Sequence, residues 1–158
     1  MADVVFKDNS IAVKNAMEEA AVIWLIEACG EVEAQTIRNS RVGDGQVKGS
    51  WRYQIDESNL KGVVGSPLEN AIWEEFGTGE HALEGKGRKT PWYVPVDGYM
   101  GKKKPTYNGK VIIVYGKNGK AYYKTNGKKP NRALFKAYTT SKNGLIRRAA
   151  AVLNERLK

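Results

Sequence analysis

The stretch from residue 71 to residue 89 holds the side chains best suited to acid/base chemistry. It contains the adjacent carboxylates Glu74 and Glu75 and the only histidine of the chain, His81. Paired carboxylates with a histidine are typical of general acid/base catalysis or metal-assisted hydrolysis. Adjacent glutamates on a helix, however, point about 100° apart, and one histidine is a thin basis for catalysis. We therefore expect no enzyme site. A small hydrolase that uses Glu74 or Glu75 remains an alternative hypothesis.

The glycines of this stretch do not form a phosphate-binding loop. Gly77 and Gly79 follow a helical pattern, whereas P-loop glycines precede the helix whose N-terminus holds the phosphate. One cysteine, Cys29, and one histidine are too few for an internal disulfide or for the Cys/His zinc arrangements. We expect no metal and no other cofactor. Cys29 falls within an apolar helical pattern and is expected as a small core residue.

Residues 86–129 are the second chemically distinctive stretch, with 12 Lys/Arg against one Asp and seven interleaved Trp and Tyr side chains. Such a mixture is typical of single-strand nucleic-acid binding, where phosphate attraction adds to base stacking. A sheet with an aromatic inner face and a lysine outer face would have the same composition. The candidate contacts for DNA or an acidic partner are Lys102, Lys103, Lys104, Lys128 and Lys129.

Charge divides the chain into two unlike parts. Residues 1–85 hold 7 Lys/Arg and 15 Asp/Glu, a net charge of −8. Residues 86–158 hold 19 Lys/Arg and 2 Asp/Glu, a net charge of +17, so the whole chain has a net charge of +9. This asymmetry suits a nucleic-acid contact through the basic part, or head-to-tail packing of one copy's acidic part on the next copy's basic part. A solvated surface with no partner would also account for it.

Length and composition fit one domain over residues 1–158. A chain of 158 residues with 41% hydrophobic side chains can bury a core. No apolar run approaches the roughly 20 residues that span a bilayer, and the start MADVVFKDNS lacks the basic-then-apolar order of a signal peptide. We expect no membrane contact and a cytoplasmic location.

The periodicity of the first half predicts a helix, two strands and a shorter helix. Apolar residues at intervals of three and four predict one long helix at about residues 10–39. Alternating side chains predict two antiparallel strands at about 47–56 and 60–66. The next helix is expected to begin at Ser66-Pro67, with Ser66 as N-cap and Pro67 at the first helical position, and to end at the Gly77 and Gly79 pair.

Residues 80–128 are expected to form a long loop and hairpin excursion, with a short strand at WYVPV. Asn118-Gly119 predicts a two-residue type I′ turn, which would place Tyr115 opposite Tyr122 and Lys117 opposite Lys120. Like charges that face each other are mildly destabilising, so an anionic neighbour would suit this tip. The candidate subunit or partner contacts are Lys117, Asn118, Gly119 and Lys120.

The last residues predict two helical stretches, PNRALFKAYTT and SKNGLIRRAAAVLNERLK, with Ser141 as a cap of the second. The expected fold class is α+β. In it, the long first helix and the C-terminal helix pack on one face of a small, mostly antiparallel, twisted sheet.

The order of these features resembles a family of phage neck and tail-completion proteins, also described as head–tail joining or phage morphogenesis proteins. That family has a long first helix, a glycine turn, a serine-containing strand, a block ending in Glu-Phe-Gly-Thr-Gly, and a Lys-Pro segment that opens a C-terminal helix. Here the turn is Val42-Gly43-Asp44-Gly45 and the strand is Val47-Lys48-Gly49-Ser50-Trp51. The block is Glu75-Phe76-Gly77-Thr78-Gly79, and the closing segment is Lys129-Pro130-Asn131-Arg132-Ala133-Leu134-Phe135.

The likeness covers nearly the whole chain, and the basic-aromatic continuation GEHALEGKGRKTPW resembles the version found in prophages of Gram-positive bacteria. The sequence departs from the family pattern at three places. The first turn lacks the usual threonine, Ala133-Leu134-Phe135 replaces Pro-Phe-Leu, and residues 95–115 are longer than the common form.

What the resemblance implies is a structural protein of the virion without enzymatic activity. Such a connector forms a ring with six-fold or twelve-fold symmetry at the virion neck, between the portal and adaptor proteins of the head and the terminator or tube of the tail. It is present in the host cytoplasm during assembly, and viral DNA is a further candidate partner. The rival interpretation is a basic nucleic-acid-binding module.

In physical terms, the block from Glu75 to Gly79 predicts a structural corner. We expect Phe76 to enter the core, and Gly77 and Gly79 to adopt backbone angles forbidden to other residues. Thr78 is expected to form a hydrogen bond with a nearby backbone group.

Overall fold

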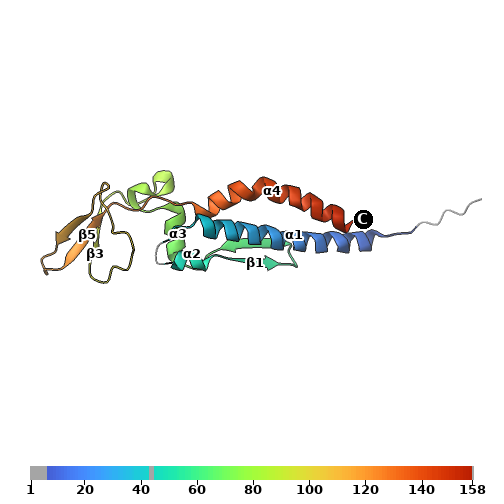
Figure 1. Cartoon of the computed structure of the whole chain (residues 1–158), viewed down its shortest axis with the longest axis horizontal. Helices are drawn as coiled ribbons and strands as arrows, with labels where there is room; N and C mark the ends of the chain where they lie inside the picture. Colours follow the sequence, from blue (N-terminus) through green and yellow to red (C-terminus); the bar gives the residue numbers. More distant parts are fainter. Residues whose placement is uncertain (1–6, 43–44, 158) are drawn as a thin grey trace, which may run out of the picture.

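The computed structural model describes residues 7–42 and 45–157, and the chain is elongated (Figure 1). The α+β class expected from the sequence is confirmed. In chain order, the elements are α1 (Ser10–Asn39), α2 (Gln46–Ser50), β1 (Arg52–Asp56), β2 (Lys61–Gly65), α3 (Glu69–Phe76), the 3-10 turns η1 (Gly79–His81) and η2 (Leu83–Gly85), β3 (Trp92–Pro95), β4 (Ile112–Tyr115), β5 (Ala121–Thr125) and α4 (Ala133–Arg156).

The two long helices, α1 and α4, run antiparallel along the molecule (Figure 1). Helix α1 begins and ends where the sequence predicted. Trp24 donates its indole hydrogen to the Leu145 carbonyl at 2.8 Å, and Asn39 donates its amide hydrogen to the Ala133 carbonyl at 3.4 Å. Small buried side chains allow the helices to approach closely. The most deeply buried of the apolar residues in α1 and α4 are Ala20, Ala133, Ala137 and Val152.

Helix α4 is continuous, whereas the sequence predicted two stretches with Ser141 as a cap. That prediction is wrong, because an N-cap residue lies outside helical geometry and Ser141 lies inside α4. The hydroxyl of Thr139 donates to the Phe135 carbonyl one turn earlier, at 2.8 Å. Such a bond accommodates polar β-branched residues within a helix.

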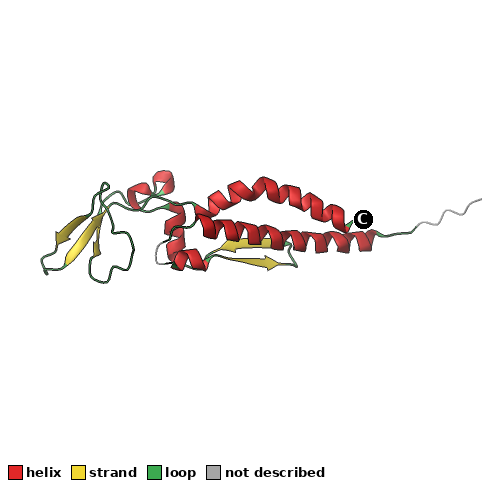
Figure 2. Ribbon diagram, viewed as in Figure 1, coloured by secondary structure: helices red, strands yellow, loops and turns green. Residues whose placement is uncertain are grey.

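The first sheet, β1–β2, packs against α1, so that α1 lies between this sheet and α4 (Figure 2). Gly62 of β2 approaches α1 so closely that an added Cβ would lie 2.4 Å from the Cys29 sulfur. Cys29 is buried, as the sequence predicted. The strands expected in one sheet are thus divided between two, β1–β2 and β3–β5–β4.

Residues 46–50 form α2 and not the beginning of a strand, so the predicted strand start at residue 47 is wrong. Gly45 has a left-handed φ of 92° and lies just before this short helix. The Ser50 hydroxyl donates to the Val47 carbonyl at 2.8 Å, which satisfies a helical carbonyl. Of the turn in the family pattern, Gly43 and Asp44 lie outside the described residues.

Helix α3 begins at Glu69, so Ser66 is not its N-cap and Pro67 is not its first residue. The Ser66 hydroxyl instead accepts a hydrogen bond from the Leu68 backbone at 3.1 Å and shares one with the Ser50 hydroxyl at 2.6 Å. Its oxygen therefore stabilises the turn before the helix. As predicted, α3 ends at a glycine, Gly77.

The second sheet has the order β3–β5–β4 and is antiparallel throughout. The predicted strand at WYVPV and the hairpin are both present, but the predicted register is wrong by one residue. Tyr115 lies opposite Ala121, and the Gly116 backbone donates to the Lys120 carbonyl at 2.9 Å. The loop therefore has three residues, with Gly119 at a φ of +73°, and Lys117 lies in the loop and not opposite Lys120. Three-residue loops with a final left-handed glycine are a common alternative to the two-residue turn.

The chain thus consists of two regions at opposite ends (Figure 1). We call α1, α2, β1, β2, α3 and α4 the helical body. We call β3, β4 and β5 with the loops between them, residues 92–125, the sheet lobe.

Candidate functional site

The block from Glu75 to Gly79 lies where the chain leaves the helical body, and residues 126–135 lie where it returns. We call these two segments, residues 74–80 and 126–135, the joint. They are bonded to each other along their backbones. Thr78 donates its backbone hydrogen to the Lys128 carbonyl at 2.9 Å, and the Thr78 hydroxyl oxygen accepts from the Lys128 backbone at 3.0 Å. Glu80 donates to the Asn126 carbonyl at 3.0 Å. The predicted backbone contact of Thr78 is confirmed.

The joint is too tight for any side chain at its glycines. Gly77 has a φ of +75°, and an added Cβ would lie 2.9 Å from both the His81 and the Lys128 carbonyl oxygens. At Gly79, with a φ of +60°, an added Cβ would lie 2.2 Å from the Asn126 carbonyl oxygen. The prediction that both glycines adopt angles unfavourable to other residues is confirmed.

Glu75 is the buried charged residue of the joint, with an exposed fraction of 8%. Its carboxylate accepts hydrogen bonds from the Leu134 and Phe135 backbones, at 3.0 and 2.9 Å. Helix α4 has no capping side chain of its own at Arg132, so Glu75 satisfies backbone donors that the first turn of α4 would otherwise leave unpaired. Its negative charge also suits the positive end of the helix dipole. Both carboxylate oxygens are therefore occupied by a structural contact.

The expected burial of Phe76 is wrong, because 54% of this residue is exposed. Helix α3 turns Ala71 and Glu75 inward, and Glu75 is held in that orientation by α4. The neighbouring Ile72 and Trp73 are also about half exposed, at 57% and 50%. The largest apolar side chains of α3 therefore form part of the surface.

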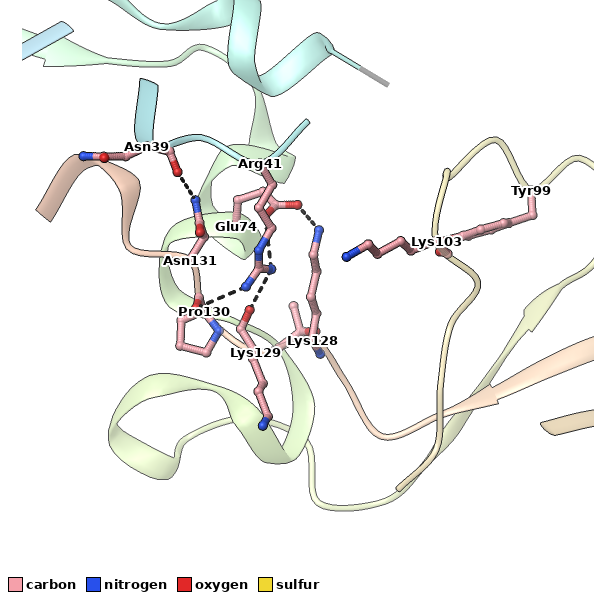
Figure 3. Close-up of polar contacts among 10 residues, drawn as sticks. Asn39, Arg41, Glu74, Tyr99, Lys103, Lys128, Lys129, Pro130 and Asn131 are labelled. Atoms are coloured by element: carbon pink, nitrogen blue, oxygen red, sulfur yellow. Dashed lines mark hydrogen bonds and ion pairs between the residues drawn. The ribbon is translucent and has the colours of Figure 1, made fainter. Parts of the chain in front are cut away.

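Glu74, which precedes this buried carboxylate, is the centre of a polar cluster that spans the joint (Figure 3). Its carboxylate forms ion pairs with Lys128 and with Arg41, the latter at 3.5 Å. The Arg41 guanidinium also donates to the Lys129 carbonyl at 3.0 Å and to the Pro130 carbonyl at 3.4 Å. The cluster therefore ties the end of α1 to both segments of the joint.

Asn131 extends this network on the side of α1. Its backbone donates to the Glu74 carbonyl at 2.7 Å, and its side-chain amide donates to the Asn39 carbonyl at 2.8 Å. Figure 3 shows Lys103 pointing from its loop in the sheet lobe toward this cluster. Through these contacts, the joint fixes the direction in which the sheet lobe leaves the helical body.

The predicted basic contacts belong to two parts of the chain, and Figure 3 shows Lys103 of the first part pointing toward Lys128 of the second. Lys102, Lys103 and Lys104 are exposed in the loop between β3 and β4, and Lys128 and Lys129 belong to the joint. Since Lys128 pairs with Glu74, its charge is already partly compensated. The predicted partner contacts Lys117, Asn118, Gly119 and Lys120 lie together, all exposed, at the tip of the β4–β5 hairpin.

Several aromatic side chains of the basic stretch are used inside the sheet lobe. Tyr99 packs edge-to-face on Tyr123, with ring centroids 5.6 Å apart, and Lys124 lies over the Tyr107 ring at 4.1 Å. Burial and the neighbouring Tyr123 raise the pKa of the Tyr99 hydroxyl. Tyr93 and Tyr115 are exposed at 55% and 76%. They are thus better placed than Tyr99 and Tyr123 to meet a partner.

Two further features of residues 7–42 and 45–157 concern metal binding and membranes. No group of three or more His, Cys, Asp or Glu side chains there is arranged to hold a metal ion. In the same ranges, no helix combines the length and the apolarity needed to cross a bilayer. Burial raises the pKa of the Cys29 thiol, which disfavours its reactive thiolate form.

No protein-family model, curated protein or solved structure matches this chain. The likeness to phage neck proteins stays a prediction from the block at Glu75 to Gly79 and the order of the features around it.

Proposed function

We propose that this chain is a structural virion protein of a tailed phage or prophage, which joins the head to the tail as one subunit of a neck or tail-completion ring. The choice of this family rests on the resemblance in sequence. The observation that carries the proposal is the amount and the kind of surface that the isolated chain exposes.

The chain exposes 11411 Å² of surface, whereas a monomeric globular protein of this length exposes about 7,900 Å². The nine residues outside the described ranges account for at most about 1,400 Å² of this area. Roughly 2,000 Å² therefore remain in excess. A ring subunit has two neighbours, and two interfaces of standard size cover about 1,600 Å² of one subunit. The excess is thus of the size that a ring would bury.

Part of the exposed surface is apolar at both ends of the molecule. In the helical body, Ile11, Val13 and Met17 on the first turns of α1 are exposed at 75%, 47% and 48%. In the sheet lobe, Met100 and Tyr115 are exposed at 84% and 76%. Apolar surface of this extent is typical of a protein that binds a neighbour. Because the two ends differ in fold, the favoured contact is head-to-tail, which closes into a ring when the rotation permits.

The rival function, nucleic-acid binding, is supported by the exposed lysines of the sheet lobe. It would be accompanied by an affinity for DNA that falls steeply with salt. Tyr99, Tyr107 and Tyr123 are engaged within the lobe, which leaves few rings for base stacking. The packing of these rings favours a protein partner for the lobe.

Deletion of the coding sequence from its source genome tests this function. After induction of particle production, the lysate is examined by electron microscopy, with the gene restored in trans as the control. We expect filled heads and separate tails to accumulate unjoined, and joined particles to return with the restored gene. Normal infectious particles from the deletion would overturn the proposal and favour the DNA-binding alternative.

A further inference from the structure

A groove lies between α1 and the turn that connects β1 to β2. It has a volume of about 470 Å³ and is lined by Glu18, Glu19, Val22, Ile23, Glu57, Ser58 and Leu60. The aliphatic side chains supply an apolar surface, and the three glutamates supply negative charge. Leu60 is exposed at 41%, although burial of a leucine side chain would be favourable in free energy. The groove is therefore an uncovered apolar surface beside three carboxylates.

The acidic side chains of this groove are largely uncompensated. Among residues 7–42 and 45–157, neither Glu19 nor Glu57 forms an ion pair. Glu18 pairs only with Lys14, at 3.8 Å, and both side chains are at least half exposed. An ion pair as exposed as this one contributes little to stability, and water screens its charges. The groove thus presents a negative potential to whatever binds there.

The tip of the β4–β5 hairpin has the opposite character. Tyr115 is exposed at 76%, and the exposed Lys117 and Lys120 lie within five residues of it on the same turn. In the described part of the chain, neither lysine forms an ion pair. The tip therefore combines an exposed aromatic ring with two uncompensated ammonium groups.

We propose that the β4–β5 hairpin tip of one copy docks into the groove between α1 and the β1–β2 turn of the next copy. Tyr115 contacts the aliphatic surface of Val22, Ile23 and Leu60. Lys117 and Lys120 meet the carboxylates of Glu19 and Glu57. This contact would supply the head-to-tail interface of the ring, and it rests on the proposed function.

The occupant is a second copy because the hairpin cannot reach its own groove. Figure 1 places the sheet lobe at the end of the molecule opposite to the first turns of α1. The joint holds the lobe there through backbone bonds and buried glycines. Since the groove and the tip are different surfaces, the contact is heterologous and repeats from copy to copy. Charge complementarity between such surfaces fixes the partner and the register.

Site-specific cross-linking tests this contact. Ser58→Cys places a thiol at the groove, and Lys120→Cys places one at the hairpin tip. The two single variants are purified, mixed at high protein concentration and oxidised. We expect a cross-linked heterodimer in the mixture and much less dimer when either variant is oxidised alone. The matched control is Lys110→Cys in place of Lys120→Cys, because Lys110 is also exposed in the sheet lobe but lies away from the tip.

A charge exchange then tests the chemistry of the contact. Adding Lys117→Glu to the hairpin variant is expected to lower the yield of heterodimer roughly 10-fold, because like charges then face each other. Adding Glu57→Lys to the groove variant as well is expected to restore the yield. A Ser58→Cys and Lys120→Cys pair that cross-links no better than the Ser58→Cys and Lys110→Cys pair would overturn the docking, as would a charge exchange without effect.

The outcomes for the docking and for the function are separable. Unjoined heads and tails in the deletion, together with no cross-linking, would overturn the docking and leave the function in place. Specific cross-linking together with normal particles would support the contact between copies and overturn the function. Binding of the hairpin to DNA without any cross-linking would also overturn the docking.

Discussion

The helical body and the sheet lobe are built from the same chain but differ in how much they bury. Of the ten buried hydrophobic residues in the described part of the chain, nine lie in the helical body, and the sheet lobe contributes Tyr123. The body buries side chains between two long helices and a sheet, whereas the lobe exposes lysines and aromatic rings. Because most of the buried hydrophobic residues lie in the helical body, we expect the body to stabilise the fold and the sheet lobe to supply surface for contacts. The joint holds the two in one orientation, so substitutions there should have the largest effects.

The largest effect is expected from Gly77→Val in the joint. The added side chain would clash with the His81 and Lys128 carbonyls and with Pro130, and the φ of +75° is unfavourable to a β-branched residue. We expect a loss of at least about 4 kcal/mol in the free energy of unfolding. Because a domain has only about 5–15 kcal/mol in total, the variant should not fold in soluble form. The measurement is the yield of soluble protein together with its circular dichroism.

Gly98→Val is the matched control for this variant. Gly98 has nearly the same φ, +76°, but nothing lies within 4 Å of an added Cβ. We expect a cost of about 1–2 kcal/mol from the backbone conformation alone. Equal losses at both positions would contradict a joint that is tighter than the lobe, and a well-folded Gly77→Val protein would remove the structural role of the block.

The second effect concerns the carboxylate that caps α4. Glu75→Ala would leave the Leu134 and Phe135 backbone donors without their partner, at a cost of about 3 kcal/mol. Glu75→Gln keeps one acceptor oxygen and should cost about half as much. Urea denaturation measures both losses. Glu69→Ala, an exposed glutamate of the same helix, is the control and should cost about 0.5 kcal/mol. A loss at Glu75 no larger than at Glu69 would contradict the cap.

The third effect is smaller and concerns the contact between the two segments of the joint. Thr78→Val keeps the shape of the side chain but removes the oxygen that accepts from the Lys128 backbone, which should cost about 1 kcal/mol. Thr140→Val on the exposed side of α4 is the control, with an expected change within about 0.5 kcal/mol. If both valines changed the urea midpoint equally, the hydroxyl of Thr78 would have no role in the joint.

The smallest effect is expected in the sheet lobe. Asn118→Ala removes an exposed side-chain oxygen that accepts from the Lys120 backbone at 3.1 Å. Because water can replace this partner, we expect a loss of about 0.5 kcal/mol or less in the free energy of unfolding. Thermal unfolding of Asn118→Ala beside Glu75→Ala measures the contrast between lobe and joint. A larger loss at Asn118 would mean that the lobe stabilises the fold.

The sequence predicted well whatever depends on periodicity or on local backbone geometry. The bounds of α1 follow from its apolar spacing, and the positive φ angles of Gly77 and Gly79 follow from the glycine pair at the end of a helix. Local signals failed where a distant partner competed for the same atoms. The Ser66 hydroxyl, expected to cap α3, is shared with Ser50, and the hairpin register depends on whether the loop has two or three residues.

The sequence predicted one part of the candidate site, the glycine block, but not the distant partners of its carboxylates. The block from Glu75 to Gly79 stands out in the sequence, but the donors that bind Glu75 lie about 60 residues later. Nothing in the spacing tells which distant backbone a carboxylate will meet. Since that contact orients α3, it also explains why Phe76 is exposed. The ion pairs of Glu74 with Arg41 and Lys128 depend on the same tertiary arrangement.

The most direct test of the central claim is reconstitution of joining from separate parts. Heads and tails from the deletion lysate are mixed with the purified chain, and infectious particles are counted, with Thr140→Val as a folded control and buffer as the blank. A protein that joins head to tail should raise the count far above the blank with both the native chain and the control. A folded native chain that leaves heads and tails unjoined, while lysate from the complete genome joins them, would contradict the claim.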